Sequence, residues 1–225
     1  PSIGSGTPDR AEDWLLIRDA LPKIIRRCDP ADYAQDEYLR RIAPISGQHG
    51  HVTLTQDVIL PMELFVRDDF LPLDDGTCLP QLGWFDTSFR FPAVKENNLV
   101  WMTVTPNEIN TIQPCVRQSH GNVLTFGLGL GYYAFHCLLK PDVRRVTVVE
   151  RDPDIISLFR ALLLPHFPRP DALEIIQADA FDFAPKPAGV RRRVHRSLAR
   201  CVGRAAALSA DEGAGSPRRE VPVLD

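Results

Sequence analysis

The sequence predicts an α/β protein whose second half carries a parallel β-sheet. From Gly121 onward, strand and helix patterns alternate. The apolar strands "NVLTFG", "RRVTVVE" and "LEIIQAD" are separated by the helical segments "GYYAFHCLLK" and "DPDIISLFRALLLPHF". Such alternation is typical of right-handed βαβ crossovers, which make neighbouring strands parallel. A second observation is the glycine-rich loop after the first of these strands, which contains Gly127, Gly129 and Gly131.

The composition of the chain is that of a globular protein without a strong charge bias. The 225 residues are 44% hydrophobic and 24% charged, which allows one large domain or two small ones. A net charge of −3 argues against a protein that binds nucleic acid or membrane surfaces overall. The five cysteines form no C-x-x-C pair, and no signal peptide or run of membrane length is found. We therefore expect a cytoplasmic protein with reduced thiols and no metal-binding motif.

Residues 1–50 are expected to form an N-terminal helical segment. "AEDWLLIRDALPKIIRRC" places its apolar residues on one broad face, with a kink or break at Pro22. "DPADYAQDEYLRRIA" has the pattern of a second helix, with Asp29 as its cap and Pro30 at its first position. A packed pair of helices is the expected outcome.

Residues 51–105 are expected to form a small antiparallel β unit. The segments "HVTLTQDVIL", "MELFVRDDF", "LGWFDTSFRF" and "NLVWMTVT" are rich in β-branched and aromatic residues, and turn signals separate some of them. Thr105, Pro106 and Glu108 then have the spacing of a capping box with proline at the first helical position. A helix is therefore predicted to begin at Pro106 and to open a third segment, residues 106–184.

The glycine loop and two following carboxylates indicate a ligand that contains adenosine. Glycines let the loop turn tightly and let a ligand approach the backbone at the amino end of the next helix. Tyr132 stands where the dinucleotide motif G-x-G-x-x-G would place its third glycine, which disfavours a dehydrogenase. Glu150 ends the second strand, where a carboxylate can accept hydrogen bonds from both ribose hydroxyls. Asp179 follows the third strand, where it can accept from the adenine amino group.

Three motifs in this order resemble those of the class I S-adenosylmethionine-dependent methyltransferases. "VLTFGLGLG" is similar to their first motif, "VTVVERDPDII" to the acidic ribose motif and "IIQADAFDF" to the adenine motif. The spermidine-synthase-like branch is the most similar one, because its first motif often lacks the usual acid, and Thr125 occupies that position here. The resemblance covers Gly121 to Ala184, under a third of the chain.

This resemblance implies a Rossmann-like sheet, incomplete in this chain, and S-adenosyl-L-methionine as the cofactor. It implies that the backbone at Gly127, Gly129 and Gly131 lines the methionine portion, while Glu150 holds the ribose. The remaining expected contacts are Asp179 and Ala180 at the adenine, and Leu128, Tyr132 and Arg151 as further walls of the site. Replacing Glu150 by alanine is expected to weaken binding and to leave folding nearly untouched.

Residues 185–225 do not continue the pattern. The resemblance implies a fourth strand here, but this segment contains no Phe, Trp or Tyr and is rich in arginine. It can be interpreted as a disordered basic tail, as a helix, or as the product of a shifted reading frame. Codons chosen for Val190–Cys201 and read one nucleotide later encode YDVVFTDLWHD, an apolar strand that ends in acidic and aromatic residues. The same frame continues to Asp225 as "VSDALPLYLRMKGLEVPAERFPYWI" without a stop, so we favour the shifted frame.

The function predicted from the sequence is a methyltransferase of unknown acceptor, truncated or inactive as written. No catalytic residue is identified, because the segment that would carry it is missing. An aminopropyltransferase and a non-catalytic adenosyl-binding or scaffold protein are the alternatives, and assay with putrescine would separate the first of them from a methyltransferase. A homodimer is also left open.

Overall fold

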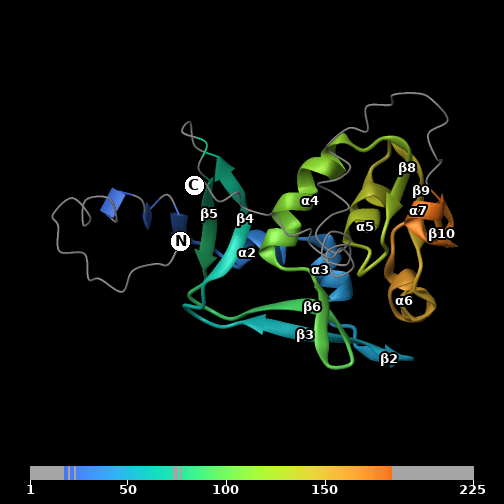
Figure 1. The fold of residues 1–225 in the computed structure, drawn as a ribbon, viewed down its shortest axis with the longest axis horizontal. Coiled ribbons are helices and arrows are strands. Elements are labelled where there is room, and N and C mark those ends of the chain that lie inside the picture. Colours follow the sequence, from blue (N-terminus) through green and yellow to red (C-terminus); the bar gives the residue numbers. More distant parts are fainter. Residues whose placement is uncertain (1–17, 20, 23, 73–75, 77, 184–225) are drawn as a thin grey trace, which may run out of the picture. The chain divides into compact units, whose positions relative to one another are not determined.

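The computed structural model describes residues 24–72 and 78–183, together with residues 18–19, 21–22 and 76 (Figure 1). The chain divides into two compact units, Pro1–Ala184 and Pro185–Asp225, and every described residue belongs to the first unit. The predictions for residues 1–17 and for the tail at 185–225 lie outside the described residues. Within them, the chain forms an α/β structure of helices and three β-sheets, as the coarse fold prediction stated.

The N-terminal region is not wholly helical, which corrects the prediction for residues 1–50. Ile25–Arg27 form strand β1, which pairs in parallel with strand β5 (Cys78–Trp84). The predicted second helix is divided into α2 (Ala31–Ala34) and α3 (Glu37–Ile42), and Gly47–His49 form strand β2. The division occurs at Asp36, whose side chain caps α3 by accepting from the backbone N–H groups of Tyr38 and Leu39. Pairing with a distant strand has overridden the local helical pattern at β1.

The antiparallel pairing predicted for residues 51–105 is confirmed, but these strands belong to two different sheets. One sheet has the order β2-β3-β6-β7, with β3 (Val52–Ile59), β6 (Phe89–Glu96) and β7 (Leu99–Thr103). The other has the order β1-β5-β4, in which β4 (Phe65–Pro72) is antiparallel to β5. Aromatic rings at Tyr33, Phe65, Phe85 and Phe89 pack against one another in this part of the core.

Helix α4 (Pro106–Gln118) begins where the sequence predicted, with Pro106 in its first turn. The Thr105 side chain makes no capping hydrogen bond, so only the position of the helix start is confirmed and not the capping box. Proline fixes φ near the helical value and lacks an N–H group that the first turn would leave unpaired. The proline therefore favours a helix start at this position.

The last sheet is parallel, as predicted, and has the order β10-β9-β8. Its strands are β8 (Gly121–Phe126), β9 (Val143–Glu150) and β10 (Leu173–Gln177). Helix α5 (Tyr132–Leu139) joins β8 to β9 and packs against β9. Four helical elements lie between β9 and β10: helix α6 (Pro153–Leu158), the π-helical turn η1 (Phe159–Leu163), and the 3₁₀ turns η2 (Leu164–His166) and η3 (Pro170–Ala172). Helix α7 (Ala180–Phe183) follows β10.

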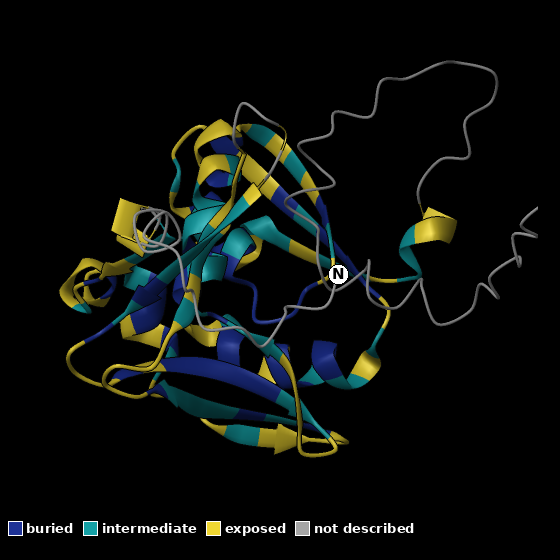
Figure 2. Cartoon of the chain, turned by 60° about the vertical axis from the view of Figure 1, so that its left-hand side comes forward, coloured by how far each residue is buried: buried dark blue, intermediate teal, exposed yellow. Residues whose placement is uncertain are grey.

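Figure 2 shows how far each described residue is buried, and the two faces of the parallel sheet differ in the burial of their residues. Thr125, Val146 and Val148 lie on one face and are buried. On the other face, Leu124 is 41% exposed, and the charged side chains of Arg145 and Glu174 pair at 3.3 Å. Strand β8 has one neighbour, β9, among the described strands, so its other edge is unpaired there.

Three cysteine side chains are free thiols, Cys28 and Cys137 in the interior and Cys78 at the surface. In the part of the chain that the structure describes, no helix combines the length and the apolar character that crossing a membrane requires.

Candidate functional site

The three segments singled out in the sequence meet at one edge of the parallel sheet. Parallel strands place their carboxyl ends together, so the loop after β8, Glu150 at the end of β9 and Asp179 after β10 leave the same edge. Backbone hydrogen bonds tie them to one another. The Gly127 N–H donates to the Val149 carbonyl at 2.8 Å, and the Ala178 N–H donates to the Glu150 carbonyl at 3.0 Å.

Glu150 organises this edge through its side chain. The carboxylate is only 6% exposed. Its Oε2 accepts from the Leu128 N–H at 2.8 Å, and its Oε1 accepts from the N–H groups of Arg151 and Asp152 at 2.8 and 2.9 Å. Each carboxylate oxygen has two lone pairs, so Oε1 is saturated and Oε2 keeps one acceptor position.

This arrangement corrects the expectation that Glu150 supports little of the folded structure. A buried carboxylate that takes three backbone N–H groups holds the glycine loop and the start of α6 in place. While these bonds persist, Glu150 has at most one free acceptor position, on Oε2, rather than two free oxygens. The sequence placed the residue correctly but could not show its backbone partners.

The three glycines of the loop have left-handed backbone conformations but different surroundings. Their φ values are +81° at Gly127, +48° at Gly129 and +72° at Gly131, which glycine adopts with little strain. A Cβ on Gly129 would lie 1.9 Å from the Met102 sulfur, and one on Gly131 would lie 2.6 Å from the Phe159 ring. A Cβ on Gly127 would meet no described atom within 4 Å, so the bare backbone at Gly127 faces open space.

Met102, on strand β7, is a part of the loop environment that the sequence did not predict. Its thioether sulfur lies against Gly129 and accepts a hydrogen bond from the Leu130 N–H at 3.2 Å. A methionine in a strand 27 residues before Gly129 has no local signal for such a role, because only folding brings the two segments together.

The Tyr132 side chain links the start of helix α5 to the N-terminal region by a hydrogen bond. Its hydroxyl donates to Asp36 Oδ2 at 2.7 Å and accepts from the Gln113 amide at 3.0 Å. The neighbouring Tyr38 hydroxyl donates to the Leu130 carbonyl at 2.6 Å. Tyr132 is buried, as is Leu128, so both side chains pack inside the protein, whereas Arg151 is exposed.

Asp36 is the shared acceptor in this buried network. His136 Nε2 lies 3.3 Å from Asp36 Oδ2, and both side chains are largely covered. Burial acts to raise the pKa of Asp36, but the contacts with His136, Tyr132 and the Leu39 N–H outweigh it, and the pKa lies below its ordinary value. Burial and the adjacent carboxylate together raise the pKa of the Tyr132 hydroxyl far above its ordinary value. Asp36 is therefore ionised, and the Tyr132 hydroxyl keeps its proton at neutral pH.

Asp179 and Ala180 begin helix α7. Asp179 is half-buried, and its Oδ1 accepts from the Phe181 N–H at 2.8 Å. The Phe183 N–H donates to the Asp179 carbonyl at 2.9 Å. One carboxylate oxygen thus caps a short helix, and the residue follows Ala178, whose N–H bonds to the Glu150 carbonyl at this sheet edge.

Comparison with known proteins does not identify a relative. No protein-family model matches the chain, and neither a curated protein nor a solved structure matches it significantly.

Proposed function

We propose that this chain carries the cofactor-binding half of an S-adenosylmethionine-dependent methyltransferase with a Rossmann-like sheet. The observation that supports this most directly is the shared sheet edge, where the glycine loop, the Glu150 carboxylate and Asp179 meet. The bare, outward-facing backbone at Gly127 and the one remaining acceptor position on Glu150 fit an adenosyl ligand.

Each part of the sheet edge is proposed to contact a different part of S-adenosyl-L-methionine. In this proposal the backbone of Gly127 to Gly131 lines the methionine portion, Glu150 accepts from the ribose, and Asp179 with Ala180 borders the adenine. S-adenosyl-L-methionine supplies an already activated methyl group, so the protein needs chiefly to align the acceptor, the methyl and the leaving sulfur. No described residue is assigned as a catalytic base.

The catalytic half of the site belongs in this proposal to a strand beside β8. The described β8 edge is unpaired and Leu124 on it is exposed, as expected of a strand that lacks its neighbour. We propose that YDVVFTDLWHD, obtained from residues 190–201 in the shifted frame, is that neighbour. The nucleotide sequence across codons 185–225 tests this directly.

A spermidine-synthase-like aminopropyltransferase is the second candidate. The segment "VVERDPDII" followed by "ADAFDF" favours it, because that combination is similar to this branch. The aspartate-rich strand that would hold a polyamine is not visible in the sequence. Assay of the frame-restored chain with putrescine and decarboxylated S-adenosylmethionine separates the two activities.

The binding test compares two glycine substitutions in the frame-restored chain. Gly127→Ala places a methyl group at the ligand edge, while Gly121→Ala places one at the opposite end of β8. Both glycines have positive φ, and a Cβ on either has no close contact, with 3.9 Å to Arg144 as the nearest at Gly121. The backbone strain of about 1 kcal/mol is therefore matched, and the variants differ in their distance from the ligand.

Isothermal titration calorimetry with S-adenosylhomocysteine and with NAD gives the readout. We expect the parent chain and Gly121→Ala to bind S-adenosylhomocysteine with similar affinity, Gly127→Ala to bind at least tenfold more weakly, and none of them to bind NAD. Tight NAD binding without a S-adenosylhomocysteine signal would contradict the proposal, and so would equal affinities for the two glycine variants.

A further inference from the structure

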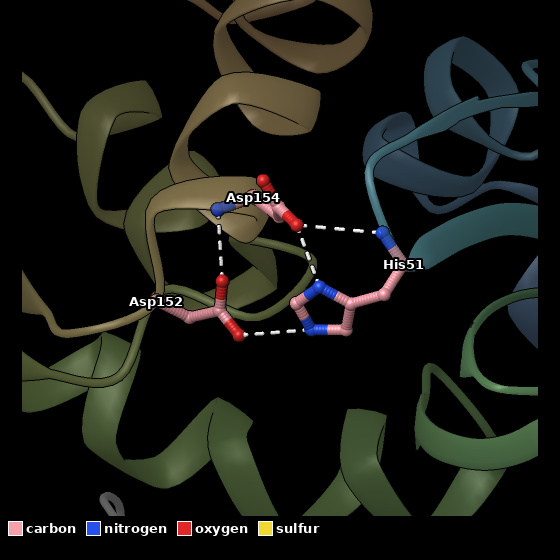
Figure 3. Close-up of side chains that lie close together, drawn as sticks. All are labelled: His51, Asp152 and Asp154. Carbon is pink, nitrogen blue, oxygen red and sulfur yellow. Dashed lines mark hydrogen bonds and ion pairs between the residues drawn. The ribbon is translucent and has the colours of Figure 1, made fainter.

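A cluster of imidazole and carboxylate groups lies just beyond Glu150. Figure 3 shows the His51 ring between Asp152 and Asp154, which come from the start of helix α6, while His51 comes from the turn between β2 and β3. His51 Nδ1 lies 2.6 Å from Asp154 Oδ2, and His51 Nε2 lies 3.4 Å from Asp152 Oδ2. Glu96, at the end of β6, places its Oε1 3.4 Å from the same Nε2.

Both aspartates are held in place by bonds that leave particular oxygens available. Asp152 Oδ1 accepts from the Asp154 and Ile155 N–H groups and thereby caps α6, which leaves Oδ2 directed at His51. Asp154 Oδ2 accepts from the His51 backbone N–H at 3.3 Å as well as contacting its ring. Gly50, with φ at +53°, permits this approach, since a Cβ there would lie 2.0 Å from Asp154 Oδ2.

The bond between Asp154 and Nδ1 determines which ring nitrogen is available. When Nδ1 carries the proton and donates it to a carboxylate, Nε2 presents its lone pair on the other side of the ring. Carboxylate–histidine pairs of this kind orient histidines that bind metals. Here Nε2 faces two carboxylates, at the end where a cation can balance their negative charge.

The distances at Nε2 suit a shared metal ion better than a direct hydrogen bond. Charge-assisted N–H···O bonds are about 2.7–2.9 Å long, whereas both carboxylates stand at 3.4 Å. Ligand atoms around a tetrahedral Zn²⁺, with bonds of about 2.0–2.2 Å, lie about 3.3–3.5 Å apart. The cluster is also partly exposed, which allows water to complete the coordination.

We infer that His51 Nε2 and Asp152 Oδ2 bind a divalent transition-metal ion, with Asp154 as the residue that orients His51. A nitrogen ligand combined with carboxylates favours Zn²⁺ over Mg²⁺, which prefers an all-oxygen octahedral shell. The ion joins the β2–β3 turn to the loop that follows Glu150. It therefore stabilises the region beside the adenosyl site, whatever reaction that site performs.

A proton is the competing occupant of Nε2. The same carboxylates, first of all Asp154 through its hydrogen bond, raise the pKa of His51 above its ordinary value. A protonated His51 would hold the cluster together as an ion-pair network without any metal. Metal-binding measurements distinguish the two occupants, since the ion-pair network takes up no Zn²⁺.

The experiment measures Zn²⁺ affinity by competition with a chromophoric chelator at pH 7.5, on the soluble fraction of the 225-residue chain after tag removal. We expect one Zn²⁺ per chain at this site. His51→Gln should weaken binding at least 100-fold, and Asp154→Ala should weaken it 10–100-fold, because the orienting bond is lost but the ligands remain. His120→Gln is the matched control, since His120 lies at the amino end of β8 and is exposed.

Two further measurements test whether weaker Zn²⁺ binding in a variant comes from loss of folding. Circular dichroism in EDTA should give the same spectrum for all variants. Asp152→Asn keeps an oxygen that can cap α6 but replaces the ligand oxygen by an amide nitrogen, so it should also weaken Zn²⁺ binding. Absence of Zn²⁺ binding to the parent chain would overturn the inference, as would equal affinities for His51→Gln and His120→Gln. Binding of Mg²⁺ as tight as that of Zn²⁺ would overturn the assignment to a transition metal.

Discussion

Replacing Glu150 by alanine should destabilise the folded chain, because the carboxylate accepts three backbone N–H groups. The Leu128 N–H bond is buried, and a buried bond to a charged acceptor contributes about 1.5–3 kcal/mol. The N–H groups of Arg151 and Asp152 are only partly buried, so water replaces part of what they lose, and each costs about 0.5–1 kcal/mol. The expected loss is therefore about 2.5–5 kcal/mol, a large share of the stability of a typical domain.

Glu150→Gln should cost roughly half as much as Glu150→Ala. The amide keeps one oxygen that can accept from Arg151 and Asp152, but it turns an N–H₂ group towards the Leu128 N–H. Two donors then face each other in the interior. The order of stability is expected to be parent, then Gln, then Ala.

Urea unfolding followed by far-ultraviolet circular dichroism at pH 7 measures these differences. Glu174→Ala is the control, because Glu174 is an exposed carboxylate of the same sheet that pairs with Arg145 at 3.3 Å. Its loss should cost under about 1 kcal/mol. If Glu150→Ala is as stable as Glu174→Ala, then Glu150 does not organise the loop and our account of this edge is wrong.

Three further predictions follow from the loop and its neighbours. Asp36→Asn should lower the free energy of unfolding by roughly 1–3 kcal/mol near neutral pH. Because the pKa of Asp36 is lowered on folding, this difference should be complete above about pH 4 and should vanish as the pH falls through the lowered pKa. Urea titrations that give the same difference at pH 3 and at pH 7 would contradict this prediction. Gly129→Ala should destabilise the chain because its Cβ would lie 1.9 Å from the Met102 sulfur. Adding Met102→Ala should restore the part of the unfolding free energy that the clash removes, but not the part due to the strained φ angle. A double-mutant cycle of unfolding free energies measures this. Restoring the shifted frame over residues 185–225 should increase the soluble yield and confer transferase activity, because the described β8 edge gains its neighbour; an active, monomeric chain as written would refute the frame shift.

The glycine loop shows how far local sequence reasoning reaches. Gly127, Gly129 and Gly131 were expected to allow a tight turn before a helix, and all three have positive φ. The strand and helix periods around them were long enough to predict the parallel sheet, because its hydrophobic pattern is a local property of each strand. The start of α4 at Pro106 was predictable for the same reason, since proline restricts its own backbone.

Elements whose form depends on a distant partner were not predictable. Ile25–Arg27 have a helical pattern but pair with β5, which lies more than 50 residues further along the chain. The short helices α2 and α3 replaced one predicted helix because Asp36 caps the second of them. In both places a tertiary or capping contact outweighed a propensity difference of under about 1 kcal/mol per residue.

In the candidate site, too, local features were predictable from the sequence and long-range contacts were not. The sequence by itself determined that a bare loop, Glu150 and Asp179 come after three consecutive parallel strands, which is enough to place them at one sheet edge. Only the tertiary structure decided that Glu150 is buried and bound to Leu128, that Met102 lies against Gly129, and that His51 meets Asp154 across 103 residues. These contacts join side chains whose separation in the chain carries no periodic signal, so they exist only once the sheets and helices have packed.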